Sequence, residues 1–191
     1  GMVKGLKNGR TSVHCTIGDI TLHLVVKVES PEQSPYLWEN MINIEDRWNL
    51  KATSSSWKTT FAANSEGIAE LYVNYSGGRA PHVTLEADSL LYSTPYAMEF
   101  RFTPQGNLIE KVTFTLNRAG NKENYLYTAQ NLVADEKTNI YVDFNELFGV
   151  KDDHAIYPIT LKNLKFTINS SATKQEYRIP IEGIYLHYKG I

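Results

Sequence analysis

From residue 68 to the end of the chain, apolar and polar residues alternate in short runs that are separated by turn-forming residues. Short runs with a period of two are typical of half-buried β-strands. Eight strands are expected, at residues 68–75, 82–87, 97–103, 111–117, 124–129, 138–144, 161–169 and 183–188. Because Gly, Pro, Asn and Asp mark the turns between many of them, the pattern predicts an all-β protein, an antiparallel β-sandwich of two packed sheets.

One stretch inside this region has a helical signal. Residues 143–149 read Asp-Phe-Asn-Glu-Leu-Phe-Gly. Either Asp143 or Asn145 supplies a side-chain cap and Gly149 a stop, so a single helical turn is expected there.

Residues 11–28 carry a separate alternating pattern. Apolar residues occupy every second position, at Val13, Cys15 and Ile17 and then at Ile20, Leu22, Leu24, Val26 and Val28, with Gly18 and Asp19 between them. The pattern predicts a β-hairpin that turns at these two residues and places His14 and His23 on its wetter face. Two strands alone are marginally stable in water, so the hairpin needs strands or a flank from elsewhere.

Between the hairpin and the sandwich, residues 29–35 are rich in Pro, Ser and Glu and have no apolar period, which is typical of a linker. Residues 36–48 are ambiguous. Leu37, Met41 and Ile44 have helical spacing, which predicts one short helix, whereas a first strand at 48–53 is the alternative. The predicted organisation is a partial domain at 1–30, a linker at 31–47 and a sandwich domain at 48–191.

Composition narrows the classes of partner. The formal net charge of -2 gives no electrostatic reason to expect nucleic acid or an anionic membrane surface. No apolar run approaches the roughly 18 residues of a membrane span, so membrane insertion is not expected.

The one Cys excludes an intrachain disulfide, and Cys15 is expected to be a small buried apolar residue. A Gly ahead of Met2 resembles a protease-cleavage scar, so the chain is expected to be a piece of a longer protein.

Signatures of catalysis are weak along the sequence. It contains no Gly-x-Ser-x-Gly, no Gly-rich phosphate loop and no paired Cys or closely spaced His ligands. Asp152, Asp153 and His154 form the one dense cluster of acidic residues and His, in a predicted turn where solvated charge is the default explanation. Glu86, Glu99 and Asp143 offer carboxylates for a glycosidase pair, but any β protein of this size does so. The chain is therefore not expected to be an enzyme, although a catalytic domain upstream is compatible with it.

Two resemblances go further. The first is between residues 5–13 followed by 20–28 and the last two strands of the bacterial immunoglobulin-like repeat of secreted and surface proteins, which this segment resembles. It rests on a Gly-containing turn, an alternating strand, a short turn and a Val-rich strand, in that order. The second resemblance is to the galactose-binding-like jelly rolls, the fold of many carbohydrate-binding modules. It rests on Pro95 before the strand 98–102, on Val142-Asp143-Phe144, on the corner Tyr157-Pro158-Ile159-Thr160-Leu161, and on a last strand after Gly183.

Joined in this order, the two parts are similar to the C-terminal accessory region of bacterial secreted phosphodiester glycosidases. The resemblance implies a non-catalytic accessory module, carbohydrate-binding, of a secreted, periplasmic or cell-surface bacterial protein. Its partners would be a glycan or the upstream catalytic domain of the same protein. The alternative is a structural spacer or protein-docking domain without a ligand of its own.

The alternation of side chains along a strand predicts which candidate binding residues face solvent and which face the core. Met98, Phe100 and Phe102 are expected to face the core together with Val112, Phe114 and Leu116. The residues between them then lie on the outer face: Glu99, Arg101, Thr113, Thr115 and Asn117, joined by Tyr125 and Tyr127 if Leu126 is the buried residue of its strand. Sugars are bound by such a mixture of aromatic rings and hydrogen-bonding side chains. Glu99, Arg101, Asn117, Tyr125 and Tyr127 are therefore the candidates for a binding face.

A second candidate group lies in the end loops, because galactose-binding-like domains often bind there. It comprises Trp57, Tyr75, Arg79 and Tyr92, with Trp57 acting either as a lid on the core or as a stacking platform. The sequence does not choose between face and loops. These folds often hold a structural calcium ion, for which Glu45 and Asp46 are the candidate oxygen ligands; no other cofactor is expected.

Overall fold

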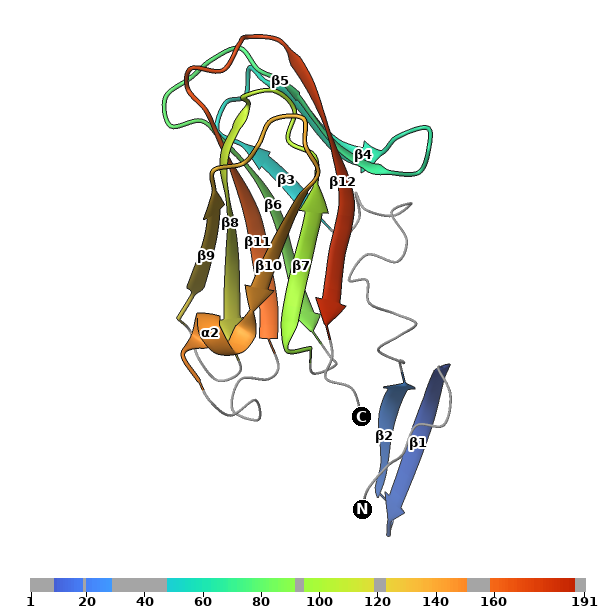
Figure 1. Cartoon of the computed structure of the whole chain (residues 1–191). Coiled ribbons are helices and arrows are strands. Elements are labelled where there is room, and N and C mark those ends of the chain that lie inside the picture. The colour runs from blue at the N-terminus through green and yellow to red at the C-terminus, as the bar shows by residue number, and fades with distance from the viewer. Residues whose placement is uncertain are drawn as a thin grey trace. The chain divides into compact units, whose positions relative to one another are not determined.

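The computed structural model describes residues 9–18, 20–28, 48–91, 95–118, 123–150 and 159–187 (Figure 1). The chain divides into two units, a hairpin within Gly1–Pro35 and a sandwich within Tyr36–Lys189. Of the short helix expected at 36–48, residues 36–47 lie outside the described residues.

The first unit contains the predicted hairpin. Strands β1 (Gly9–Ile17) and β2 (Ile20–Val28) are antiparallel, and Ile17 lies opposite Ile20. This register leaves a two-residue turn, for which the positive φ of Gly18 (61°) is suited. The hairpin prediction is confirmed, while its membership of an immunoglobulin-like repeat stays a prediction.

The second unit is a sandwich of two antiparallel sheets, each of five strands. Sheet 1 has the order β10-β7-β12-β5-β4 and sheet 2 the order β3-β6-β11-β8-β9. The strands are β3 (Asn49–Ala52), β4 (Lys58–Ala63), β5 (Ala69–Asn74), β6 (His82–Leu91), β7 (Ala97–Phe102), β8 (Ile109–Arg118), β9 (Tyr125–Gln130), β10 (Thr138–Asp143), β11 (Ile159–Ile168) and β12 (Glu176–His187). The predicted all-β sandwich is confirmed.

Strands β5 to β12 follow the jelly-roll path. Along the chain β5, β7, β10 and β12 enter sheet 1, while β6, β8, β9 and β11 enter sheet 2. These are the eight strands that alternation predicts. β3 matches the alternative strand at 48–53, and β4 was not predicted because Phe61 is its one large apolar residue. Both extend the sheets at an edge, β3 beside β6 and β4 beside β5.

The core is filled by the side chains that alternation places inward. Phe100, Phe102, Phe114 and Phe166 are fully buried and pack ring on ring, with centroids 5.0–6.2 Å apart. Such aromatic contacts add to the free energy gained from burying the rings. Met98, Val112 and Leu116 are likewise fully buried, so the predicted inward faces of β7 and β8 are correct.

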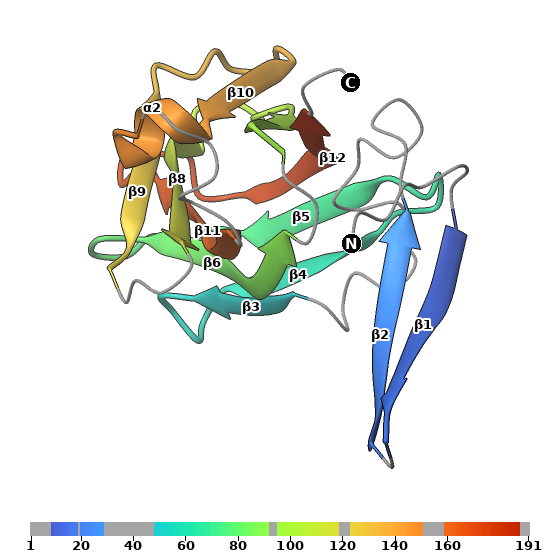
Figure 2. The same ribbon diagram turned by 90° about the horizontal axis from the view of Figure 1, so that it is seen from below.

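A short helix, α2 (Phe144–Phe148), follows β10. Asp143 caps it by accepting a hydrogen bond from the Glu146 backbone N–H at 3.0 Å, and Gly149 ends it with φ 62°. The predicted helical turn is confirmed, with Asp143 as the cap. Figure 1 shows α2 at one end of the sandwich, and Figure 2 shows it beside β9 and β10. The Phe148 ring packs edge-on against the Tyr125 ring, with centroids 4.7 Å apart.

Candidate functional site

The two outer faces of the sandwich differ in composition. Residues paired across antiparallel strands point to the same side of a sheet, so the registers assign each side chain to a face. Among the described side chains, the outer face of sheet 1 carries Tyr72, Tyr141, Tyr185 and His187. The described outer face of sheet 2 carries no Phe, Tyr or Trp and is instead rich in threonine, with Thr84, Thr113, Thr115, Thr128, Thr160 and Thr167.

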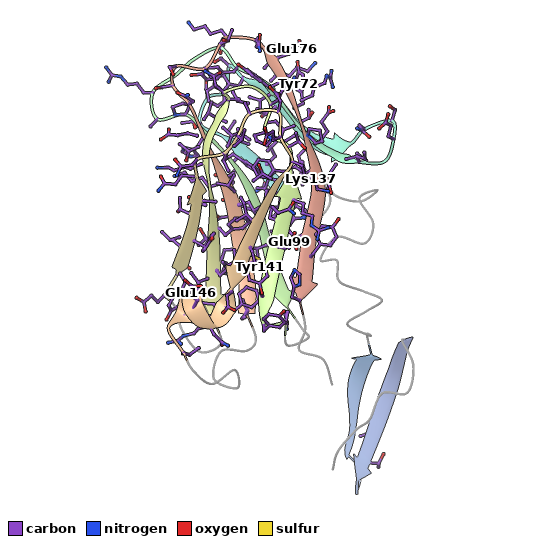
Figure 3. All side chains as sticks on the ribbon, in the orientation of Figure 1. Tyr72, Glu99, Lys137, Tyr141, Glu146 and Glu176 are labelled. Carbon is purple, nitrogen blue, oxygen red and sulfur yellow. The ribbon has the colours of Figure 1, made fainter. Side chains whose placement is uncertain are left out.

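The rings of sheet 1 gather around one carboxylate. Glu99 on β7 lies directly opposite Tyr141 on β10 and directly opposite Tyr185 on β12. Figure 3 shows Glu99 and Tyr141 close together on this face. Arg101 and His187 complete the group, and we call these five residues, Glu99, Arg101, Tyr141, Tyr185 and His187, the Glu99 cluster.

The carboxylate of Glu99 is held on both of its oxygens. Arg101 Nε lies 2.7 Å from Oε1 and Nη2 3.1 Å from Oε2, while His187 Nε2 lies 3.1 Å from Oε2. Glu99 is 9% exposed and is the one buried charged residue among those described. The hydrogen bonds from Arg101 hold the pKa of Glu99 below its usual value, with a smaller contribution from His187. The residue is therefore a fixed anion at neutral pH.

Arg101 is fixed from a second side. Its guanidinium carbon lies 3.9 Å from the centroid of the Tyr185 ring, in cation–π geometry. Hydrogen bonding to Glu99 raises the pKa of Arg101 further above its already high value. Stacking and pairing together hold the guanidinium in one orientation, so the cluster is preorganised before any ligand arrives.

Tyr141 is the most exposed ring of the cluster, at 44%. Its ring lies edge-on to His187 with centroids 5.4 Å apart. Partial burial, a hydrogen bond with Tyr96 and nearby carboxylates raise the pKa of Tyr141 to about 12. The phenol therefore stays protonated at neutral pH and presents an aromatic surface to solvent.

A shallow depression lies farther along the same face. It has a volume of about 430 Å³ and is lined by Thr60 and Ala62 of β4, by residues 63–66, by Glu70 of β5 and by Arg178 of β12. Arg178 Nη1 contacts Glu70 Oε1 at 2.8 Å, and its guanidinium carbon lies 5.0 Å from the ring centroid of Tyr72. The outer face of sheet 1 therefore continues from the Glu99 cluster into a polar hollow.

The structure keeps two of the predicted face residues together and separates the others. Glu99 and Arg101 share the cluster on sheet 1, whereas Asn117, Tyr125 and Tyr127 belong to sheet 2. The outer faces of two packed sheets point in opposite directions, so the predicted single face is wrong. Asn117 lies on the outer side of sheet 2 and donates its side-chain N–H to the Glu123 carbonyl at 2.8 Å.

Tyr125 and Tyr127 do not face outward, because the condition for that prediction, a buried Leu126, is not met. Leu126 is 62% exposed, while both tyrosines are half-buried and pack against the core. The register is the reason, because Tyr125 lies opposite Leu116 and Tyr127 opposite Phe114, two core residues.

Trp57 is a core lid, the first of its two predicted roles. It is 5% exposed, donates from Nε1 to the Gly77 carbonyl at 3.0 Å, and meets the Tyr75 ring edge-on at 5.2 Å. Tyr75 is 1% exposed, so neither ring is available as a stacking platform. In the end-loop group, Arg79 is exposed and Tyr92 lies outside the described residues.

The remaining candidates are dispersed or untested. Glu86 lies on sheet 2, where it pairs with Lys51 at 2.6 Å, away from Glu99. Asp143 caps α2 from the outer side of sheet 1 and is one of the two carboxylates, with Glu99, whose charge raises the pKa of Tyr141. Glu45, Asp46 and residues 152–154 lie outside the described residues, and a structural calcium ion stays a prediction. Within the described ranges, no three His, Cys, Asp or Glu side chains are grouped to hold a metal. No described helix is long and apolar enough to cross a membrane.

Tyr141, Tyr185 and His187 are the residues that sequence reasoning missed. They lie within predicted strands and alternate with buried Val142, Ile184 and Leu186, so their outward orientation was readable. What was not readable is that β10 and β12 flank β7, because both partners are remote from β7 in sequence.

Comparisons with known proteins give similarity in structure alone. No protein-family model matches the sequence, and no curated protein does. One similar solved structure is a carbohydrate-binding module of the β-sandwich superfamily, described for promiscuous specificity. It has a TM-score of 0.51 and 16% identity over 97% of this chain and 77% of that chain. The similarity shows a shared β-sandwich fold.

Two further solved structures have TM-scores of 0.49. One is the module TmCBM61 in complex with β-1,4-galactotriose, 12% identical over 82% of this chain and 100% of that one. The other is the glycoside hydrolase domain of Endo-D from Streptococcus pneumoniae, 11% identical over 74% of this chain and 22% of that chain.

Proposed function

We propose that this chain is a non-catalytic carbohydrate-binding module that binds a glycan on the outer face of sheet 1, through the Glu99 cluster. The observation that carries the proposal is the grouping of an exposed tyrosine with a fixed carboxylate, guanidinium and imidazole on one face. The shared fold with a carbohydrate-binding module supports it. At this level of identity that support concerns the fold, so the site must carry the function.

The chemistry of the cluster matches that of a sugar ring. A pyranose offers an apolar C–H face and a rim of hydroxyls, and the 44%-exposed ring of Tyr141 suits the first. Glu99, Arg101 and His187 supply an acceptor and donors for the second. Because these groups already hold one another in place, binding orders few side chains and loses little conformational entropy.

The wider context follows from the sequence resemblance. We propose an accessory module of a secreted, periplasmic or cell-surface bacterial carbohydrate-active protein, whose second partner is an upstream catalytic domain. A structural calcium ion that involves Glu45 and Asp46 belongs to the same proposal. Its test is a comparison of melting temperature in calcium and in chelator, where an increase with calcium is expected.

A glycan array probed with this chain, in calcium and in chelator, tests the proposed function. Tyr141→Ala is the test variant, because it removes an exposed ring of the site. Leu126→Ala is the matched control, since Leu126 is also exposed but lies on sheet 2. We expect saturable binding that is weakened by Tyr141→Ala and unchanged by Leu126→Ala. Absence of binding on the whole array contradicts the proposal and favours a spacer or docking domain.

A further inference from the structure

Three of the four described cations on the outer face of sheet 1 are paired with carboxylates, and the fourth, Lys58, is on the edge strand β4. Arg101 pairs with Glu99 at 2.7 Å, Arg178 with Glu70 at 2.8 Å, and Lys137 with Glu182 at 2.7 Å. The first two pairs lie on the strands themselves, within the Glu99 cluster and at the edge of the depression. A negatively charged ligand therefore meets cations whose charge is already compensated.

The described side chains of this face also carry more carboxylates than cations. The carboxylates are Glu70, Glu99, Asp143, Glu176 and Glu182, and the cations are Lys58, Arg101, Lys137 and Arg178. Lys58 is on the edge strand β4, at the far side of the sheet from Tyr141 on β10. Glu70 and Glu176 lie towards β4 as well, so the described charges nearest the cluster are the Glu99–Arg101 and Lys137–Glu182 pairs and Asp143. Their sum is one negative charge, which disfavours an approaching anion.

Within the cluster, an anionic ligand would have to compete with Glu99 for Arg101. Glu99 is 9% exposed and is held through both oxygens, so displacing it would leave a buried carboxylate without its main partner. Uncompensated buried charge is strongly destabilising. A neutral sugar needs no such exchange, because its hydroxyls bond to the lone pairs and N–H groups that remain.

We infer that the Glu99 cluster selects neutral glycans and rejects glycans that carry carboxylate or sulfate groups. This inference rests on the proposed function and adds the class of ligand to it. The selectivity comes from the pairing of each guanidinium on the face with a carboxylate of the same face.

Matched polymer pairs test the inference. Each pair has one backbone in a neutral and an anionic form: hydroxyethylcellulose with carboxymethylcellulose, methyl-esterified with de-esterified homogalacturonan, and laminarin with sulfated laminarin. Affinity gel electrophoresis of the chain at low salt gives the dissociation constants. For any backbone that binds, we expect the neutral form to bind at least about tenfold tighter.

The outcomes separate the two proposals. Equal or tighter binding of the anionic form overturns the charge selectivity and leaves glycan binding standing. Binding to neither member of any pair, with an empty glycan array, overturns both.

Charge variants locate the effect. The variant Glu99→Gln releases Arg101, and the separate variant Glu70→Gln releases Arg178. Each is expected to reduce the preference for the neutral form at least about threefold. Glu86→Gln is the matched control, since it makes the same charge change on sheet 2, where Glu86 pairs with Lys51 at 2.6 Å. Circular dichroism confirms folding. If Glu86→Gln changes the preference as much as the other two, net charge rather than the paired face causes it, and the inference is wrong.

Discussion

Arg101 and Glu99 form a two-point ion pair on the solvent side of β7, with donor–acceptor distances of 2.7 and 3.1 Å. Residues two apart on a strand point to the same side, so the pair forms within one strand. Glu99 would otherwise be a buried charge without its main partner. The pair thus links the stability of the sandwich to the geometry of the proposed site.

Arg101→Ala should destabilise the fold. Glu99 would keep only His187 as a partner, and leaving a buried acceptor undersatisfied costs about 1–3 kcal/mol. Urea unfolding followed by tryptophan fluorescence measures the loss. Arg178→Ala is the control, because the Arg178 side chain is 62% exposed and its pair with Glu70 should contribute less than about 1 kcal/mol. Equal losses in the two variants would contradict a special role for the Glu99 pair.

The stability of the fold should depend on pH through Glu99. Its folded-state pKa is lowered, so the stability it contributes is complete above the unfolded value of about 4.3 and is lost as the pH falls through the folded pKa. Glu99→Gln removes this contribution. We expect the variant to be less stable than the wild type at pH 7 and the difference to shrink towards pH 3, in urea unfolding at several pH values. A difference that stays constant with pH would contradict the lowered pKa.

Tyr141 should act through its ring more than through its hydroxyl. Tyr141→Phe keeps the aromatic surface and is expected to lower glycan affinity by less than about fivefold, whereas Tyr141→Ala should lower it at least about tenfold, the range of a lost aromatic contact. Calorimetry with a bound oligosaccharide measures both. Equal losses would show that the hydroxyl, and not stacking, carries the contact.

Trp57 should matter for stability and not for binding. Trp57→Phe loses the hydrogen bond to the Gly77 carbonyl, at a cost of about 0.5–1.5 kcal/mol, while most of the buried ring surface is kept. The melting temperature should fall and the glycan affinity should not change at a temperature where the variant is folded. Reduced affinity in the folded variant would contradict this prediction and indicate that Trp57 contacts the ligand.

Much of the fold could be predicted because alternation along a strand reports burial directly. Met98, Phe100 and Phe102 occupy alternate positions of one strand, and all three are buried. The helical turn at 144–148 followed from its cap Asp143 and its stop Gly149. Such local signals are complete within a few residues.

The candidate site could be predicted only in part, because it depends on which strands pair. Glu99 and Arg101 are neighbours in sequence, but Tyr141 and Tyr185 reach them only through the order β10-β7-β12. Tyr125 and Tyr127 were misplaced for a different reason. Their strand alternates tyrosine with leucine, both of which pack well on a sheet, so the pattern fits either face and a shift of one residue reverses it.

The most direct test of glycan binding by the outer face of sheet 1 is amide chemical-shift mapping during titration with an oligosaccharide chosen from the array. If the glycan binds at the Glu99 cluster, the largest saturable changes occur at Glu99, Arg101, Tyr141, Tyr185 and His187. Changes concentrated at Thr113, Thr115 and Thr128 on sheet 2, or in the end loops around Trp57 and Arg79, would contradict it.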